Sequence, residues 1–286
     1  MRPEVEQALS ALKGGEVERG LKLLERTVLS FGMKVCGHRE DAEDTAQEVL
    51  LKLLPYISKF DNPKAFSVWL YTVARNRCLM SRRHSKFAPK EHLALEDLMP
   101  KDEELAALSK ASATPEASVL RNENSDHIRR ALEKIPPHYR LVLVLHDMEG
   151  LGTAEVAKVS RLREGTVRVR LHRARLALRK ELASPNRRAP RTRRKDKATP
   201  KPRSCREIFA ALSDYLDHEL DSEMCERLEN HMAGCTPCEA FLAELEKTVE
   251  HCRMYDPGSK APKSAIKQKF LAEYTRAMES LQNQSL

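Results

Sequence analysis

Apolar residues recur along this chain at intervals of three and four, the spacing of one helix face, and strand-like alternation is almost absent. Residues 153–160 and 164–181 predict two helices separated by a turn, and residues 265–281 predict a last amphipathic helix. Two stripes within residues 16–83 consist of Val17, Leu21, Leu24, Val28 and Phe31, and of Val49, Leu50, Leu53 and Leu54. We therefore expect an all-α protein.

Two polar segments interrupt the helical pattern and predict linkers. Residues 84–123 are charged and rich in Ala and Ser, so we expect at most one short helix there. Residues 184–204 hold nine Lys or Arg, four Pro and one acidic residue, and this composition predicts disorder because it offers nothing to bury. The expected parts are helical domains at 1–83 and 124–183, linkers at 84–123 and 184–204, a cysteine-rich domain at 205–252 and a tail at 253–286.

Charge is distributed unevenly along the chain. The formal net charge of +8 favours a polyanionic partner. Residues 205–252 contain twelve Asp or Glu and three Lys or Arg, a net charge of −9, so the rest of the chain carries +17. The sequence therefore joins an acidic module to a basic one.

Cysteine usage and the apolar pattern bear on the compartment. No apolar run reaches the roughly eighteen residues that a membrane span needs, and the N-terminus lacks the apolar core of a signal peptide. We therefore expect a cytoplasmic protein without a membrane partner. The cysteines number seven, and five of them lie in the last third. In a reducing cytosol this clustering indicates metal or redox chemistry and not a disulfide framework.

The segment 163–181 has a net charge of +5 and two distinct faces. Its position after a short helix and a turn is the layout of a helix-turn-helix, whose second helix enters a DNA major groove. On spacing alone, a solvated basic face on an ordinary helical hairpin is an equally good interpretation. The expected apolar stripe is Val167, Leu171, Ala174 and Leu178, and the cationic face holds Arg168, His172, Arg175 and Arg179.

Residues 132–150, 155–157 and 165–175 resemble region 4 of the extracytoplasmic-function (ECF) sigma factors of bacterial RNA polymerase. Arg161 stands where this family often has a turn glycine, at a cost of roughly 1 to 2 kcal/mol if the residue is left-handed. Arginine suits guanine edges, with which it forms two parallel hydrogen bonds. The resemblance implies that the minus-thirty-five element is read by Arg168, Val169, His172 and Arg173, with Val169 replacing a small hydroxyl residue.

Residues 41–54, 66–77 and 81–83 are similar to region 2 of the same family. The resemblance implies that Asp44, Gln47 and Glu48 contact core RNA polymerase, and their position within the motif favours this interface over a solvated helix face. It also implies that the loop 60–65 receives a flipped base of the minus-ten element, with Asp61, Asn62 and Lys64 as polar groups. Phosphate contacts would come from Arg75, Arg77, Arg82 and Arg83.

Two details of this region bear on DNA binding. The apolar stripe of Phe66, Trp69 and Leu70 predicts core packing in preference to a stacking platform for melted DNA. Met80 stands where the family carries an acidic residue, which puts the promoter contacts of this helix in doubt.

The C-terminal pattern Cys205, His231, Cys235, Cys238 predicts a metal site. His231 and Cys235 share a helix face, and three thiolates with one imidazole form a closed tetrahedral site for which Zn²⁺ is the natural metal. The segment also looks like the zinc-binding anti-sigma domain, which is normally a separate protein. Surface or core positions are the simpler interpretation of Cys225, His251 and Cys252, which lie outside the pattern.

These observations predict an ECF-type sigma factor that brings core RNA polymerase to promoter DNA and is not itself an enzyme. The fused zinc-binding domain is expected to contact the sigma domains and regulate them, and the sequence is compatible with inhibition and with activation. The alternative is a helix-turn-helix regulator without polymerase binding. A zinc hydrolase is disfavoured because four protein ligands leave no position for a reactive water.

Overall fold

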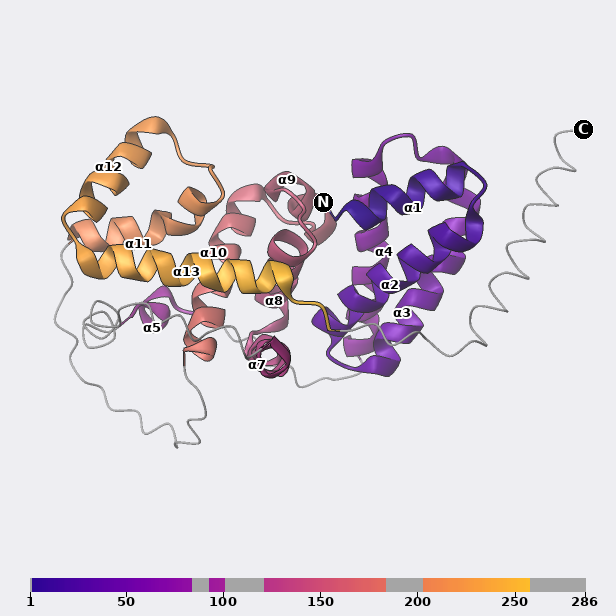
Figure 1. Cartoon of the computed structure of the whole chain (residues 1–286), viewed down its shortest axis with the longest axis horizontal. Helices are drawn as coiled ribbons and strands as arrows, with labels where there is room; N and C mark the ends of the chain where they lie inside the picture. The colour runs from indigo at the N-terminus through magenta and orange to yellow at the C-terminus, as the bar shows by residue number, and fades with distance from the viewer. Residues whose placement is uncertain (1, 84–92, 101–120, 184–202, 258–286) are drawn as a thin grey trace, which may run out of the picture. The chain divides into compact units, whose positions relative to one another are not determined.

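The computed structural model of the protein describes residues 2–83, 93–100, 121–183 and 203–257, in which every regular element is helical (Figure 1). The prediction of an all-α chain is therefore confirmed. The predicted linker 184–204 up to residue 202, most of the linker 84–123 and the predicted helix 265–281 lie outside the described residues. No helix of the described ranges combines the length and the apolar composition that crossing a bilayer requires.

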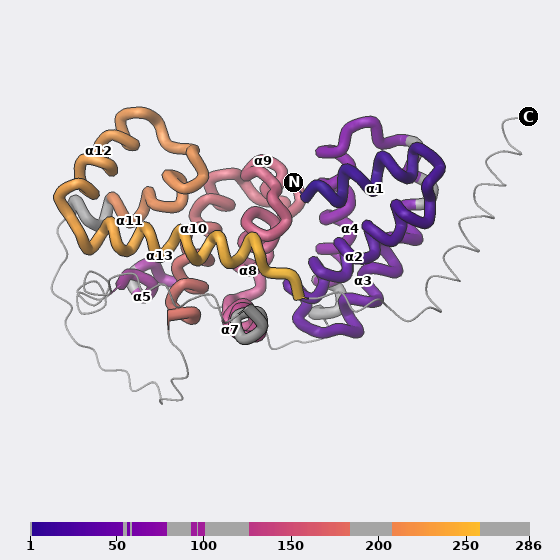
Figure 2. Tube along the Cα trace, viewed as in Figure 1, coloured from indigo at the N-terminus to yellow at the C-terminus, as the bar shows by residue number. Residues whose placement is uncertain are grey.

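The chain divides into two compact units, and each is described by itself. Unit 1 draws on residues 1–89, 144–163 and 256–286, and unit 2 on residues 90–143 and 164–255. Figure 2 follows the backbone through both units in chain order.

Unit 1 contains five α-helices and two irregular turns of helix within its described residues. They are α1 (Pro3–Lys13), α2 (Val17–Cys36), α3 (Arg39–Leu53), the 3₁₀ helix η1 (Leu54–Lys59), α4 (Pro63–Arg83), the π-helical turn η3 (Val144–Met148) and α9 (Thr153–Ser160). Helix α2 lies beside both α1 and α3. The predicted stripe forms this core, since Leu24, Val28 and Phe31 are fully buried.

A buried ionic cluster links Glu149, the residue directly after η3, to the helices of unit 1. The Glu149 carboxylate accepts hydrogen bonds from Lys34 Nζ at 2.9 Å and from the Tyr71 hydroxyl at 2.7 Å. Arg2 Nε lies 3.1 Å from the same carboxylate. The side chains of Lys34, Tyr71 and Glu149 have no solvent exposure. Burial lowers the pKa of Lys34 and raises the pKa of Tyr71 well above its usual value.

Unit 2 holds the predicted cationic helix and the cysteine-rich segment. Its elements are α5 (Leu95–Leu98), α7 (Arg121–Lys134), α8 (Pro137–Leu143), α10 (Glu164–Leu182), α11 (Arg203–Leu216), α12 (Ser222–Ala233) and α13 (Thr236–Met254). The predicted apolar stripe of α10 is confirmed, because Val167, Leu171, Ala174 and Leu178 are buried. Helix α10 contacts α7 and α8, and it also contacts α11 and α13.

The turn between α9 and α10 contains a left-handed residue. Arg161 has φ 56° and ψ 46°, the conformation for which glycine is favoured, so the family's usual glycine is replaced here at a local cost. We expect Arg161→Gly to raise the free energy of unfolding by about 1 kcal/mol. The measurement is the urea midpoint followed by circular dichroism. Arg163→Gly is the matched control, since Arg163 has no positive φ and should gain nothing.

Candidate DNA interface and metal site

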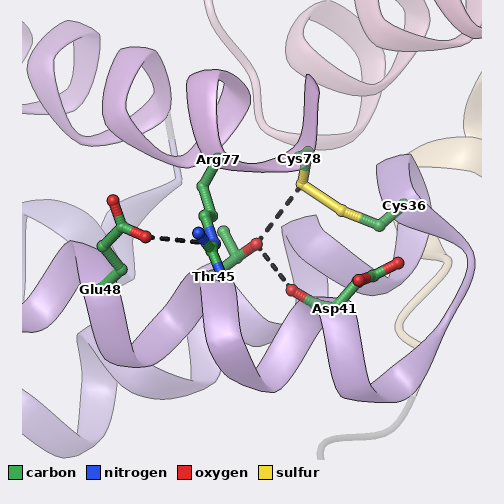
Figure 3. The surroundings of a disulfide bond; sticks show 6 residues. All are labelled: Cys36, Asp41, Thr45, Glu48, Arg77 and Cys78. Atoms are coloured by element: carbon green, nitrogen blue, oxygen red, sulfur yellow. Dashed lines mark hydrogen bonds and ion pairs between the residues drawn. A yellow bond between two sulfur atoms is a disulfide. The ribbon is translucent and has the colours of Figure 1, made fainter. Parts of the chain in front are cut away.

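The three residues predicted to contact polymerase, Asp44, Gln47 and Glu48, lie on α3. Asp44 is exposed, and Gln47 and Glu48 are half-buried. Arg77 of α4 bridges this face, with its Nε 3.1 Å from Glu48 (Figure 3). Its Nη2 lies 3.7 Å from Asp44. Lys52 also pairs with Glu48 at 2.7 Å. A residue predicted to hold phosphates therefore lies directly against residues predicted to hold polymerase.

The loop between η1 and α4 presents three exposed polar residues, Asp61, Asn62 and Lys64. The Asn62 side chain accepts a hydrogen bond from the Lys64 backbone at 2.8 Å, and thereby caps the first turn of α4. Asp61 accepts one from Lys13 Nζ at 2.9 Å, and this contact lowers the pKa of the Asp61 carboxyl. Lys13 belongs to α1, outside the motif, so sequence reasoning did not find it.

Helix α4 carries the predicted phosphate-binding arginines. Arg75 is half-buried, and its burial together with the charge of Arg161 lowers its pKa. The side chains of Arg82 and Arg83 lie outside the described residues. The prediction of core packing is confirmed for Phe66 and Leu70, which are fully buried.

Trp69 is only partly buried. Its ring centroid lies 5.9 Å from that of Tyr56 and 5.5 Å from that of Phe60. Trp69 thus packs against two aromatic neighbours while remaining partly exposed, where the apolar stripe predicted core packing.

The four predicted base readers differ in exposure along α10. Arg168 and Val169 are exposed, Val169 at 51 %, and Arg173 is half-buried. His172 is buried, and its Nδ1 lies 2.9 Å from the hydroxyl of Ser213 on α11. Burial, followed by the charges of Arg175 and Arg173, lowers the pKa of His172 to about 4. His172 is therefore neutral at pH 7.

Acidic residues of the cysteine-rich segment form ion pairs with the arginines of α10. Arg175 is fully buried and forms a bidentate pair with Asp217, at 2.8 and 2.7 Å. Arg168 Nε donates to Glu219 at 2.6 Å. At the other end of the helix, Arg179 Nε donates to Glu244 of α13 at 2.6 Å. The face that the sequence predicted to be cationic is thus largely neutralised within unit 2.

Aromatic packing accompanies these pairs. The Arg179 guanidinium lies 4.2 Å from the ring centroid of Phe241, which meets Phe209 edge-on at 4.8 Å. Both phenylalanines are buried. The contact between α10 and the cysteine-rich segment therefore combines desolvated charge pairs with an apolar centre, as do stable protein interfaces.

Three of the four predicted metal ligands converge at the junction of α12 and α13. His231 lies in the last turn of α12, Cys235 is the N-cap residue of α13, and Cys238 lies in the first turn of α13. Their ligand atoms all lie within 4.8 Å of one another, with His231 Nε2 3.4 Å from Cys238 Sγ. An imidazole and two thiols at this spacing suit Zn²⁺. Cys205 lies in α11, and its side chain lies outside the described residues.

Comparison with known families divides the chain into three matched segments. Residues 21–87 match the family described as Sigma-70 region 2, and residues 125–178 match Sigma-70, region 4. Residues 205–238 match a family described as "Putative zinc-finger". These segments contain Asp44, Gln47 and Glu48 of α3, the four predicted base readers of α10, and the cluster of His231, Cys235 and Cys238.

Several curated relatives are RNA polymerase sigma factors. The ECF RNA polymerase sigma factor SigW of Bacillus subtilis is 35 % identical over 152 residues, which are 52 % of this chain and 79 % of the relative. The RNA polymerase sigma-H factor of Pseudomonas aeruginosa is 29 % identical over 58 % of this chain and 90 % of its own length. The sigma-E factor of Escherichia coli is 27 % identical over 48 % of this chain and 72 % of its own. With both sigma segments and a relative at this identity and coverage, the chain belongs to the ECF RNA polymerase sigma factors and carries an additional zinc-finger segment.

Proposed function

We propose that the C-terminal domain of this sigma factor inhibits its own promoter binding by covering the DNA-reading helix α10. The observation that supports the proposal most strongly is the bidentate pair of Arg175 with Asp217. The Arg175 side chain in this pair is fully buried. Arg168, predicted to read bases, is paired with Glu219 in the same arrangement. DNA and the acidic domain would compete for the same helix face.

The base readers in this proposal are Arg168, Val169, His172 and Arg173, and core polymerase is bound by Asp44, Gln47 and Glu48. His172 is buried by Ser213, so a base edge and α11 cannot both occupy this side chain. The C-terminal domain would therefore be unable to dock on α10 while α10 reads the minus-thirty-five element. Polymerase binding through α3 is a separate step, since Asp44, Gln47 and Glu48 belong to unit 1.

Because the C-terminal domain is covalently linked to α10, a weak contact is enough to keep it docked. Residues 184–202 connect α10 to α11. Their composition predicts a flexible coil, and a coil of about twenty residues spans roughly 25 Å. Linkage at this length gives an effective concentration on the order of millimolar. A contact of only micromolar intrinsic affinity would then keep the docked state occupied in nearly all molecules, and promoter DNA would have to displace it.

Asp217 offers a direct test of this competition. Removing one partner of a buried charge pair costs about 3 to 5 kcal/mol, so Asp217→Ala should weaken docking by more than a hundredfold. We expect the variant to bind a minus-thirty-five duplex more tightly than wild type and to transcribe more. Glu226→Ala is the matched control, because Glu226 is an exposed acid on α12 and its loss changes the net charge equally. Equal gains in both variants would show a general charge effect and contradict docking through Asp217.

Acidification should release the domain through His172. The pKa is about 4 when His172 is covered and near 6.5 when it is exposed, so the exposed state takes up more protons between these values and docking weakens as pH falls. At pH 5.5 docking should be weaker than at pH 7.5 by about 1.4 kcal/mol, or tenfold. The measurement compares the DNA affinity of a chain of residues 1–183 with that of the full chain at each pH. The ratio of the two affinities reports docking, because only the full chain carries the C-terminal domain. His172→Asn should abolish the change in this ratio, and a ratio independent of pH in wild type would contradict the assignment.

Arg173 and Arg82 are proposed to act differently on DNA. A base contact by Arg173 implies that Arg173→Ala lowers affinity by about 1 to 3 kcal/mol and relaxes preference at one position of the upstream element. A phosphate contact by Arg82 implies that Arg82→Ala weakens all promoters alike. Binding of a panel of single-base upstream variants measures both effects. If Arg173→Ala lowers the affinity for every DNA of the panel by the same factor, Arg173 does not read a base.

The proposed polar groups of the minus-ten pocket are Asp61, Asn62 and Lys64, with phosphate contacts from Arg75, Arg77, Arg82 and Arg83. The exposure of the three loop residues supports this assignment. Sigma factors are not enzymes in general, and we propose none of these groups as catalytic. Because its proposed partners are core polymerase and promoter DNA, the protein is proposed to act in the cytoplasm.

Zinc is proposed to bind His231, Cys235 and Cys238, with Cys205 as the fourth ligand. The converging ligand atoms and the zinc-finger match support the first three. The fourth is supported by the sequence pattern and by the packing of α11, the helix that carries Cys205, against α12 and α13. When bound, zinc would join these three helices through its ligands and supply no chemistry beyond this structural role. Ser213 of α11 and Asp217, which directly follows this helix, would thereby be held in place against α10.

A further inference from the structure

Two cysteines outside the C-terminal cluster are joined in unit 1. Cys36 and Cys78 form a disulfide, with their Cα atoms 5.7 Å apart and a sequence separation of 42 (Figure 3). Cys36 is the last residue of α2, which ends at the left-handed Gly37, and Cys78 lies in α4. The bond therefore ties two helices of the region 2 segment together, whereas the sequence analysis attributed cysteine chemistry only to the C-terminal cluster.

The surroundings of the bond connect it to α3. Thr45 Oγ1 lies 3.7 Å from Cys78 Sγ and donates a hydrogen bond to the Asp41 carbonyl at 2.7 Å. Cys78 directly follows Arg77, the residue that pairs with Glu48. Cys36 is 4 % exposed and Cys78 is 1 % exposed, so both sulfur atoms lie in the packed core where α2, α3 and α4 meet (Figure 3).

We propose that Cys36 and Cys78 form a redox-controlled cross-link that restrains the promoter- and polymerase-binding part of region 2, independently of the C-terminal domain. The residues between the two cysteines include α3, η1 and most of α4. All of the acidic residues proposed to hold polymerase, the loop 60–65, Arg75 and Arg77 belong to the loop that the bond closes. Opening or closing this one bond would change the freedom of that whole surface.

The oxidant is a small peroxide such as hydrogen peroxide. The thiolate of one cysteine attacks a peroxide oxygen, which breaks the O–O bond, releases one water and leaves a sulfenic acid. The second thiol attacks that sulfur, forms the S–S bond and releases a second water. Two thiols thus lose two electrons and two protons, and one hydrogen peroxide becomes two waters. A thiol reductant reverses the change by exchange.

Because Cys36 and Cys78 are buried, only a small oxidant can reach their sulfur atoms. Cys36 is the terminal residue of its helix, and helix ends open locally at a low free-energy cost. Such opening admits a molecule close to water in size far more readily than a bulky disulfide. The two sulfurs are held adjacent by packed helices, so the second step proceeds at high effective concentration. The pair should therefore oxidise to the internal disulfide and not to mixed disulfides with large thiols.

Peptide mapping of the full chain tests the cross-link. Trypsin cuts after Lys34, Arg39, Arg77 and Arg82, so Cys36 falls in peptide 35–39 and Cys78 in peptide 78–82. After reduction, removal of reductant and treatment with hydrogen peroxide, a non-reducing digest should contain these two peptides joined, with two hydrogens fewer than their sum and with Met80 partly oxidised. Dithiothreitol should separate them. Two free peptides after peroxide, or either peptide joined to a C-terminal cysteine, would overturn the proposal.

The fluorescence of Trp69, the single tryptophan, reports the consequence for unit 1. Closing a loop of this length restricts the unfolded chain, and we expect the oxidised full-length protein to melt at least about 5 °C above the reduced protein. Cys225→Ser, a control outside unit 1, should keep the whole shift. Cys36→Ala and Cys78→Ala should each abolish it. If either variant fails to fold, the wild-type comparison with and without dithiothreitol still decides, because equal melting temperatures would overturn the proposed restraint.

Discussion

Chelation of the purified protein should unfold the C-terminal domain while leaving the sigma domains folded. The binding free energy of a structural zinc is about 10 to 16 kcal/mol and is at the same time folding free energy. The cluster of His231, Cys235 and Cys238 lies at the junction of α12 and α13, so its loss removes the link between α12 and the helix that carries Glu244. We expect one zinc per chain in metal analysis and a loss of helical circular dichroism on chelation that corresponds to residues 205–252.

Cys235→Ser is expected to abolish zinc binding and to lower helicity in the same way. Cys225→Ser is the matched control, because Cys225 lies on α12 outside the ligand cluster and should keep one zinc. Freshly purified wild type without zinc under reducing conditions would contradict the assignment. So would a Cys235→Ser protein that retains a full equivalent of metal.

Glu149→Ala should destabilise unit 1 by about 3 to 5 kcal/mol, because it leaves the buried Lys34 ammonium without its partner. The substitution also removes the acceptor of the Tyr71 hydroxyl. Urea unfolding followed by Trp69 fluorescence isolates this effect, since the single tryptophan lies on the same helix as Tyr71.

A double variant separates the charge from the packing. Replacing the buried pair by apolar side chains in Lys34→Met with Glu149→Leu should cost less than Glu149→Ala alone, because no buried charge is left unpaired. Glu6→Ala, an exposed acid on α1, is the control and should change the unfolding free energy by less than about 0.5 kcal/mol. A Glu149→Ala midpoint equal to that of wild type would show that the pair contributes nothing to unit 1.

The local pattern of the sequence predicted the helices better than it predicted their contacts. Periodic apolar positions identify the buried face of α10 because a helix repeats within its own segment, and Val167, Leu171 and Ala174 are buried as expected. Helix α1 was missed although Val5, Leu9 and Leu12 form a short buried stripe that the same pattern could have revealed. Its short length made the signal weak.

Long-range partners had no signal in the sequence. Glu149 meets Lys34 and Tyr71 across 115 and 78 residues, and nothing in the local pattern distinguishes it from a surface acid. Arg175 belonged to a face that predicted cationic exposure, but its burial depends on Asp217 in another domain. The cluster of His231, Cys235 and Cys238 was easier to recognise, because the short spacing of these residues around the turn between two helices is itself the constraint that brings them together.

Run-off transcription with purified core RNA polymerase tests the proposed self-inhibition most directly. Full-length protein and a chain ending at Ala183 are compared on the same promoter at equal concentration and equal salt, which matters because phosphate contacts weaken steeply with salt. If the acidic domain covers α10, the shorter chain produces more transcript, and Asp217→Ala raises the full-length protein toward the same level. An equal yield from both chains, or a lower yield from the chain ending at Ala183, would contradict inhibition by the C-terminal domain.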